Sequence, residues 1–178
     1  MVVVLVSMRS APARADDPSP AEHKGVGVGF HNIEAPLGVR WWLASQKVGV
    51  DLGLGFHSTP SAIFADEHLK SWGIAAGVPI VLKSWPRVHF LFRPGILWQS
   101  QEVETTAPPA AFNTDTEKTL EVIAELEGEA FLLDNFSVSA SEGIAYKHFD
   151  PIAGDSESSF GTVGGDFAHV GFHVYLFR

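Results

Sequence analysis

The stretch that decides the fold class is residues 48–57, VGVDLGLGFH. Large apolar side chains occupy every second position, and glycine, one aspartate and one histidine fill the positions between them. Successive side chains of a β-strand point to opposite faces of the sheet. The alternation therefore predicts a strand with one large apolar face and one small or polar face.

Seven further segments alternate in the same way, so the sequence predicts eight strands. Their apolar faces begin at Val26, Leu37, Trp72, Val88, Leu120, Phe136 and Ala168. Residues 119–133 are also rich in helix formers and could make a helix of about four turns. We expect a strand there, because the acidic residues recur mainly at every second position.

The connections between these segments alternate in length. The short ones lie at residues 45–47, 83–87 and 133–135, and the long polar ones at residues 58–70, 100–118 and 148–166. Only the first connection, around residues 32–35, is short where this scheme requires a long one. All long loops then fall at one end, which is typical of transmembrane β-barrels. The prediction is an all-β, eight-stranded antiparallel up-and-down transmembrane barrel.

Composition indicates one compact domain. The chain has 178 residues, of which 46% are hydrophobic and 19% charged, and the absence of cysteine excludes a disulfide scaffold or a thiolate metal site. Lys+Arg of 12 against Asp+Glu of 21 gives a net charge of -9, which argues against a nucleic-acid partner. The longest uncharged stretch near the middle, residues 71–82, is shorter than the roughly 20 residues of a transmembrane helix.

Residues 1–15 predict an export signal. An apolar run at residues 2–6 precedes the small-x-small pattern of residues 13–15, which a signal peptidase would cut before Asp16. The run is short and no basic residue precedes it, so a truncated signal peptide is expected, and a disordered tail is the alternative. Residues 16–23 would form an exposed lead-in, and residues 24–178 the barrel.

The second face of the strands separates a membrane barrel from a soluble one. A soluble ligand-binding barrel has an apolar interior, whereas small and charged residues here fit a narrow hydrated lumen and leave the apolar face for lipid. Aromatic residues near both ends of the strands predict two interfacial girdles. These are Phe30, Phe56, Trp72, Trp98 and Tyr146 at the long-loop end, and Trp85, Phe90, Phe136 and Phe177 at the short-turn end.

Eight charged residues on the second face predict an ion-pair network inside the lumen. They are Arg40, Asp51, Arg93, Glu121, Glu125, Glu127, Glu129 and Lys147. Pairing around a turn at residues 134–135 would set Leu132 against Phe136 and Glu121 against Lys147. Filling of the lumen by these side chains is favoured over a cation-selective pathway, because eight strands enclose little more than side chains.

This pattern resembles the small eight-stranded outer-membrane β-barrels of Gram-negative envelopes, such as the OmpA-type transmembrane domain and the OmpX-like and OmpW-like proteins. The resemblance covers roughly residues 24–178 and rests on strand number, loop alternation, girdles and the ending VYLFR. It implies an outer-membrane location, with outer-membrane lipid and the barrel assembly machinery as partners. The terminal Phe177 departs from the family, since it shares its phase with His173 rather than with the lipid-facing residues, which suggests a bulge or looser recognition by that machinery.

Two features bear on this interpretation. Glu142 shares the apolar phase of its segment, so a β-bulge or protonation is expected to relieve its contact with lipid. Histidines near the long-loop end could bind zinc or copper, or act as a base toward Ser58 or Ser141 in a lipid hydrolase. These histidines are His31, His57, His148 and His169.

The favoured function is structural or surface-interacting. No metal motif and no Gly-x-Ser-x-Gly motif is present, so no catalytic residue, metal or cofactor is predicted. A monomer is expected, with an extracellular ligand of the loops left open. A small cation-preferring channel or an outer-membrane lipid-modifying enzyme is the first alternative, and a soluble periplasmic ligand-binding barrel is the second.

Overall fold

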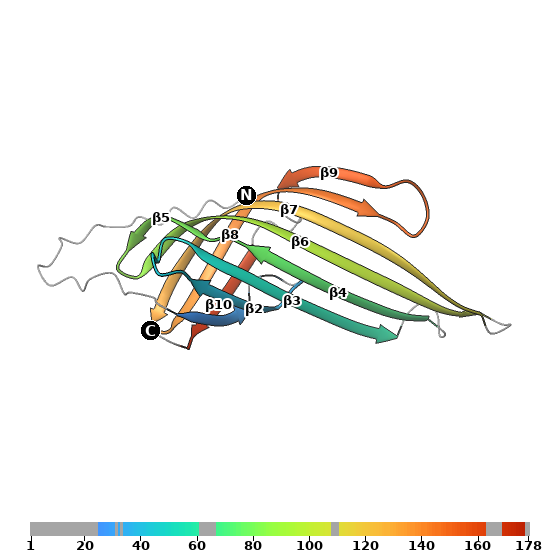
Figure 1. Cartoon of the computed structure of the whole chain (residues 1–178), viewed down its shortest axis with the longest axis horizontal. Helices are drawn as coiled ribbons and strands as arrows, with labels where there is room; N and C mark the ends of the chain where they lie inside the picture. Colours follow the sequence, from blue (N-terminus) through green and yellow to red (C-terminus); the bar gives the residue numbers. More distant parts are fainter. Residues whose placement is uncertain are drawn as a thin grey trace, which may run out of the picture.

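The structure, a computed structural model, describes residues 25–30, 32, 34–60, 67–107, 111–162 and 169–176 (Figure 1). The strands are β1 (Val26–Phe30), β2 (Leu37–Trp42), β3 (Gly49–Pro60), β4 (Glu67–Gly77), β5 (Ile80–Trp85), β6 (Val88–Ala107), β7 (Ala111–Leu133), β8 (Phe136–Asp150), β9 (Glu157–Thr162) and β10 (His169–Tyr175). Within the described residues, no helix is long and apolar enough to cross a membrane. The predicted signal peptide and lead-in lie outside them, as does Phe177.

The strands close an eight-stranded antiparallel barrel. Their order is β10-β1-β2-β3-β4-β6-β7-β8, and β10 pairs with β8 to complete the ring. β4 and β5 both pair with β6 and form successive parts of one barrel strand, interrupted at Val78 and Pro79. The predicted all-β class and up-and-down antiparallel order are confirmed, and residues 119–133 are strand rather than helix.

The predicted long loops are wrong in part, because much of their length is paired strand. β6 and β7 pair without interruption from Val88↔Ala130 to Ala107↔Ala111, and β3 and β4 pair out to Pro60↔His68. Residues 100–118 contain valine, threonine and phenylalanine, which favour strands even where neither face is apolar. These hairpins extend together from one end of the barrel (Figure 1).

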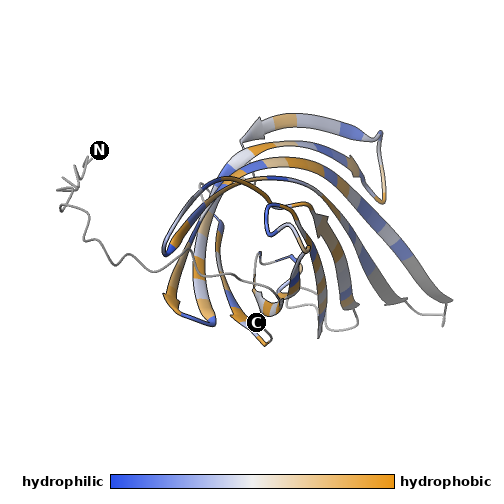
Figure 2. Cartoon of the chain, turned by 60° about the vertical axis from the view of Figure 1, so that its left-hand side comes forward, coloured by the Kyte–Doolittle hydropathy of each residue, from blue (hydrophilic) through white to orange (hydrophobic). Residues whose placement is uncertain are grey.

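The barrel wall is uneven at this hairpin end. β9, which the sequence pattern missed, pairs with the part of β8 nearer the hairpin end, from Ile144 to Phe149. β10 pairs with the part of β8 nearer the short-turn end, from Phe136 to Ser141. β2 reaches β3 only as far as Leu37↔Leu54. Beyond that level the described wall is a curved sheet in the order β3-β4-β6-β7-β8-β9, open above the short β1–β2 hairpin (Figures 1 and 2).

Side chains alternate across the barrel wall as the sequence predicts. Leu52 and Leu54 are 56% and 59% exposed on the outside, whereas Arg40 and Glu127 are 0% exposed on the inside. The alternation of apolar and polar residues along the strands is visible in Figure 2. The molecule therefore has an apolar exterior and a charged interior.

The β7–β8 turn corrects one predicted register. Leu133, not Leu132, pairs with Phe136, because the register shifts between Phe131 and Leu133. A two-residue turn at Asp134 and Asn135 requires its flanking residues to pair, and the shift absorbs the extra residue. Glu121 opposite Lys147 is as predicted.

Candidate functional site

Arg40 is the centre of the charged network in the lumen. Its Nε and Nη2 each donate a hydrogen bond of 2.8 Å to the Asp51 carboxylate, and Nη1 and Nη2 each donate one of 2.9 Å to Glu127. Nη1 also lies 3.4 Å from Glu129 Oε2. Asp51 comes from the neighbouring strand β3 and Glu127 from β7, so one fully buried guanidinium ties non-adjacent parts of the wall together.

Arg93 on β6 extends the network toward the hairpin end. Its Nε donates 2.7 Å to Asp51 Oδ2, and its Nη1 donates 2.8 Å to Glu125 Oε2. Glu125 Oε1 lies 2.9 Å from His169 Nδ1. Asp51 thus accepts from both arginines, and two guanidiniums bind four carboxylates: Asp51, Glu125, Glu127 and Glu129.

Glu129 is held by hydroxyl donors at the short-turn side of the network. Ser137 Oγ donates 2.6 Å and Tyr175 OH donates 2.8 Å to its Oε1. Trp42 Nε1 in turn donates 3.1 Å to Tyr175 OH. Trp42, Leu91, Phe131 and Tyr175 form a buried apolar cluster there.

Replacing Tyr175 with phenylalanine tests this arrangement. The variant keeps the ring and removes one donor to a buried carboxylate, so the free energy of unfolding should fall by about 1.5–3 kcal/mol. Urea unfolding of the purified protein would measure it. Tyr146→Phe is the matched control, since it loses only an exposed hydrogen bond to Ser158. Equal stability of the two variants would contradict a contribution of Tyr175 through Glu129.

A second, apolar layer crosses the lumen beyond the charges. It contains Ala35, Ala75, Leu97, Ile123 and Ala145, all buried. Ala35 belongs to the short β1–β2 connection, which folds into the barrel, and its amide donates 2.8 Å to Asn32 Oδ1. This explains why that connection departs from the short–long alternation: it fills the lumen instead of projecting from it.

Two glycines make room for this inward connection. A Cβ on Gly55 would lie 2.0 Å from the Glu34 carbonyl oxygen, and one on Gly73 would lie 2.8 Å from the same atom. Backbone cannot move aside as the end of a side chain can. The glycines on the inner faces of β3 and β4 therefore leave room for the inward β1–β2 connection, which we call the plug.

Above the plug, the lumen widens into a cavity of about 460 Å³, which we call the outer cup. Glu34 and Pro36 lie on its plug side, and β3, β4, β6, β7 and β8 contribute its wall. Its polar wall residues include His57, Ser71, Gln99, Gln101, Glu117 and Thr119, and its aromatic ones Phe56, Trp72 and Phe149. From the turn end outward, the lumen thus passes through aromatic, charged, apolar and polar layers.

The structure brings together six of the eight predicted network residues. Glu121 and Lys147 form a separate pair at 3.1 Å on neighbouring strands, with the Lys147 side chain 45% exposed. The network also uses residues that the prediction omitted: Ser137, His169 and Tyr175. His169 and Tyr175 share the inward phase of β10, so periodicity could have found them, whereas the folding-in of Ala35 had no such signal.

The histidine hypotheses find no support in the described contacts. His148 Nδ1 lies 3.0 Å from Ser158 Oγ on the exposed face, not against Ser58 or Ser141. His169 contacts Glu125 instead. Within the ranges that the structure describes, no group of three or more His, Asp or Glu is placed to hold a metal ion. His31 lies outside those ranges.

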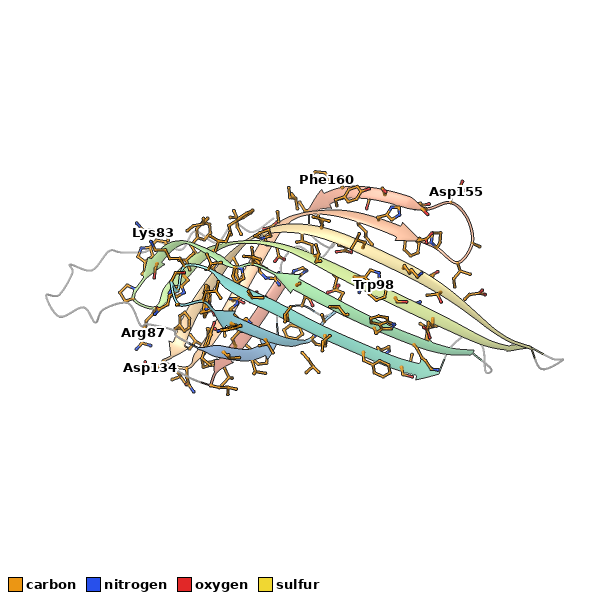
Figure 3. The ribbon with its side chains drawn as sticks, viewed as in Figure 1. Lys83, Arg87, Trp98, Asp134, Asp155 and Phe160 are labelled. Atoms are coloured by element: carbon orange, nitrogen blue, oxygen red, sulfur yellow. The ribbon has the colours of Figure 1, made fainter. Side chains whose placement is uncertain are left out.

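The predicted girdle residues within the described ranges lie on the outward phase of their strands. Trp72 and Trp98 contact each other edge-on, with ring centroids 4.3 Å apart, and Phe30 stacks on Phe172. Phe160 on β9 is 71% exposed and adds an aromatic that the sequence pattern missed. Phe160 and Trp98 are labelled in Figure 3, as are Lys83, Arg87 and Asp134 at the short-turn end. The other predicted girdle residues on this phase are Phe56, Trp85, Phe90, Phe136 and Tyr146.

Glu142 is exposed on the outer face opposite Leu126, in the phase that the sequence predicts. The expected bulge beside it is wrong, because the β7–β8 register runs unshifted from Lys118↔Asp150 to Phe131↔Ser137.

A comparison of the chain with protein-family models and with curated proteins finds no match.

Proposed function

We propose that this protein is an outer-membrane β-barrel of a Gram-negative envelope, with a structural or surface-interaction role and a lumen closed by its own side chains. The observation that carries the proposal is the inversion of polarity. Arginine and three glutamates are fully or almost fully buried inside, whereas large aliphatic side chains are exposed outside. Such an arrangement is costly in water and favourable in lipid.

The exposed apolar side chains support the proposal further because they are contiguous. Val39 pairs with Leu52, Leu54 with Ile74 and Ile96 with Val122, so the patch continues from strand to strand. Monomeric soluble proteins rarely expose apolar patches beyond a few hundred Å². The aromatic residues near the ends of the apolar band are placed as interfacial girdles would be.

Fractionation with gel mobility tests the proposal. The full chain should sediment with membranes, dissolve only in detergent, and migrate differently on SDS gels before and after boiling. Equal migration in both lanes, together with solubility without detergent, would favour the soluble ligand-binding barrel.

The closed lumen predicts almost no conductance. The charged network and the Ala35 layer both cross the interior, and an eight-stranded barrel has little room for a water column beside them. Planar-bilayer recordings of purified protein should give only small or rare openings. Steady cation-selective current that falls in Glu125→Gln or Glu127→Gln would instead favour the channel.

A further inference from the structure

The outer cup has the dimensions of a small-molecule site and one closed end. Its volume of about 460 Å³ lies within the roughly 300–1,000 Å³ of known ligand pockets. The inward β1–β2 connection lies at its inner end, and the apolar layer separates it from the charged network. A molecule that enters from the hairpin end would be held rather than passed on.

The chemistry of the cup wall favours a positively charged guest. Glu34 and Glu117 both line it, and neither lysine nor arginine does so among the described residues. Phe149, on the inward phase of β8, adds aromatic surface, which attracts cations through the π face. Gln99 and Ser71 supply neutral hydrogen-bonding groups on the same wall.

The surroundings of the cup carry the same sign. Residues 58–70, 100–118 and 148–166 together contain ten acidic and two basic residues, a net charge of -8. Among the described residues of these ranges, six acidic side chains and two basic ones lie at the hairpin end of the barrel: Glu102, Asp115, Glu117, Asp150, Asp155 and Glu157 against Lys70 and Lys118. A concave site surrounded by charge of one sign concentrates counter-ions of the other.

We propose that the outer cup binds a small organic polycation of the polyamine class. The cup volume exceeds that of a single inorganic ion many times, and its aromatic surface suits methylene groups between ammonium groups. Glu34 and Glu117 accept from the ammonium groups, while Phe149 contacts the chain between them. Binding does not require the protein to be in a membrane, so this proposal and the proposed function can fail independently.

Calorimetric titration of the full chain in detergent with spermidine tests the proposal. We expect saturable one-site binding at low salt, weakened about fivefold by Glu117→Gln. Glu157→Gln is the matched control, because it removes the same charge from the same end but its side chain does not line the cup. The affinity of the Glu157→Gln variant for spermidine should stay within about twofold of that of the unmodified chain. Ser71→Phe, which fills the cup without changing charge, should abolish binding.

Several outcomes would overturn the proposal. The first is equal weakening of spermidine binding by Glu117→Gln and Glu157→Gln, which would indicate only a diffuse electrostatic field. The second is unchanged spermidine binding in Ser71→Phe, and the third is the absence of saturable binding. Magnesium binding with the same affinity and the same sensitivity to Glu117→Gln would assign the cup to an inorganic cation. Unheated gel mobility checks that each variant is folded, and Glu117→Gln provides the test if Ser71→Phe does not fold.

Discussion

Arg40→Ala should lower the free energy of unfolding by about 3–5 kcal/mol, the largest effect expected of any single substitution in this barrel. The arginine is 0% exposed and binds Asp51 and Glu127 through four hydrogen bonds, with Glu129 at 3.4 Å. Its removal leaves buried carboxylates without their main counter-charge. The barrel would be refolded into detergent micelles and unfolded with urea. The folded fraction, monitored by gel mobility without heating, would measure the loss in the free energy of unfolding.

Two controls separate the ion pairs from the loss of a long side chain. Arg87→Ala removes an exposed arginine whose Nη1 donates a 3.5 Å hydrogen bond to the Leu132 carbonyl, and should change stability by less than about 0.5 kcal/mol. Adding Glu127→Gln to Arg40→Ala should restore part of the loss, because one unpaired charge disappears. A double variant no more stable than Arg40→Ala would contradict the account of the network.

Leu52→Arg is the second large expected effect. Leu52 is 56% exposed on the outer face, between Val39 on β2 and Ala76 on β4, with no charged residue directly opposite on either strand. In lipid, an arginine near mid-membrane costs about 2–4 kcal/mol, whereas at an exposed position in water it costs almost nothing. Refolding into lipid vesicles at increasing urea would measure the difference.

Leu43→Arg provides the matched control for depth. Leu43 is 40% exposed but lies beside the short turn that follows β2, where an arginine can reach water. It should cost less than about 1 kcal/mol. Equal costs at Leu52 and Leu43 would contradict a lipid-facing band.

The strand faces could be predicted from the sequence because the period of two is a local property. Leu52 and Asp51 are neighbours in the chain and point to opposite sides of the wall, whatever the rest of the fold does. The Glu121–Lys147 pairing also followed from a short turn and a register. Local rules therefore identified both the barrel class and six members of the network.

The remaining features depend on contacts between distant parts of the chain. The inward fold of the connection at Glu34 and Ala35 requires space beside Gly55 and Gly73, and only the closed barrel brings that connection against β3 and β4. The long hairpins were mistaken for loops because their residues are polar on both faces and show no apolar period. The donation of Arg40 to Glu127 links residues 87 positions apart, and no spacing rule pairs them.

The central claim, that the apolar face contacts lipid while the opposite face is enclosed, is tested most directly at two adjacent tryptophans. Trp41 is 56% exposed on the outside of β2, and Trp42 is 4% exposed on the inside. Two variants would each keep one of these and replace the other four of the chain's five tryptophans with phenylalanine. In vesicles of lipids with brominated acyl chains, the fluorescence of the Trp41 variant should be strongly quenched and that of the Trp42 variant largely preserved. Equal quenching of the two, or quenching of Trp41 only by iodide from the water, would contradict the claim.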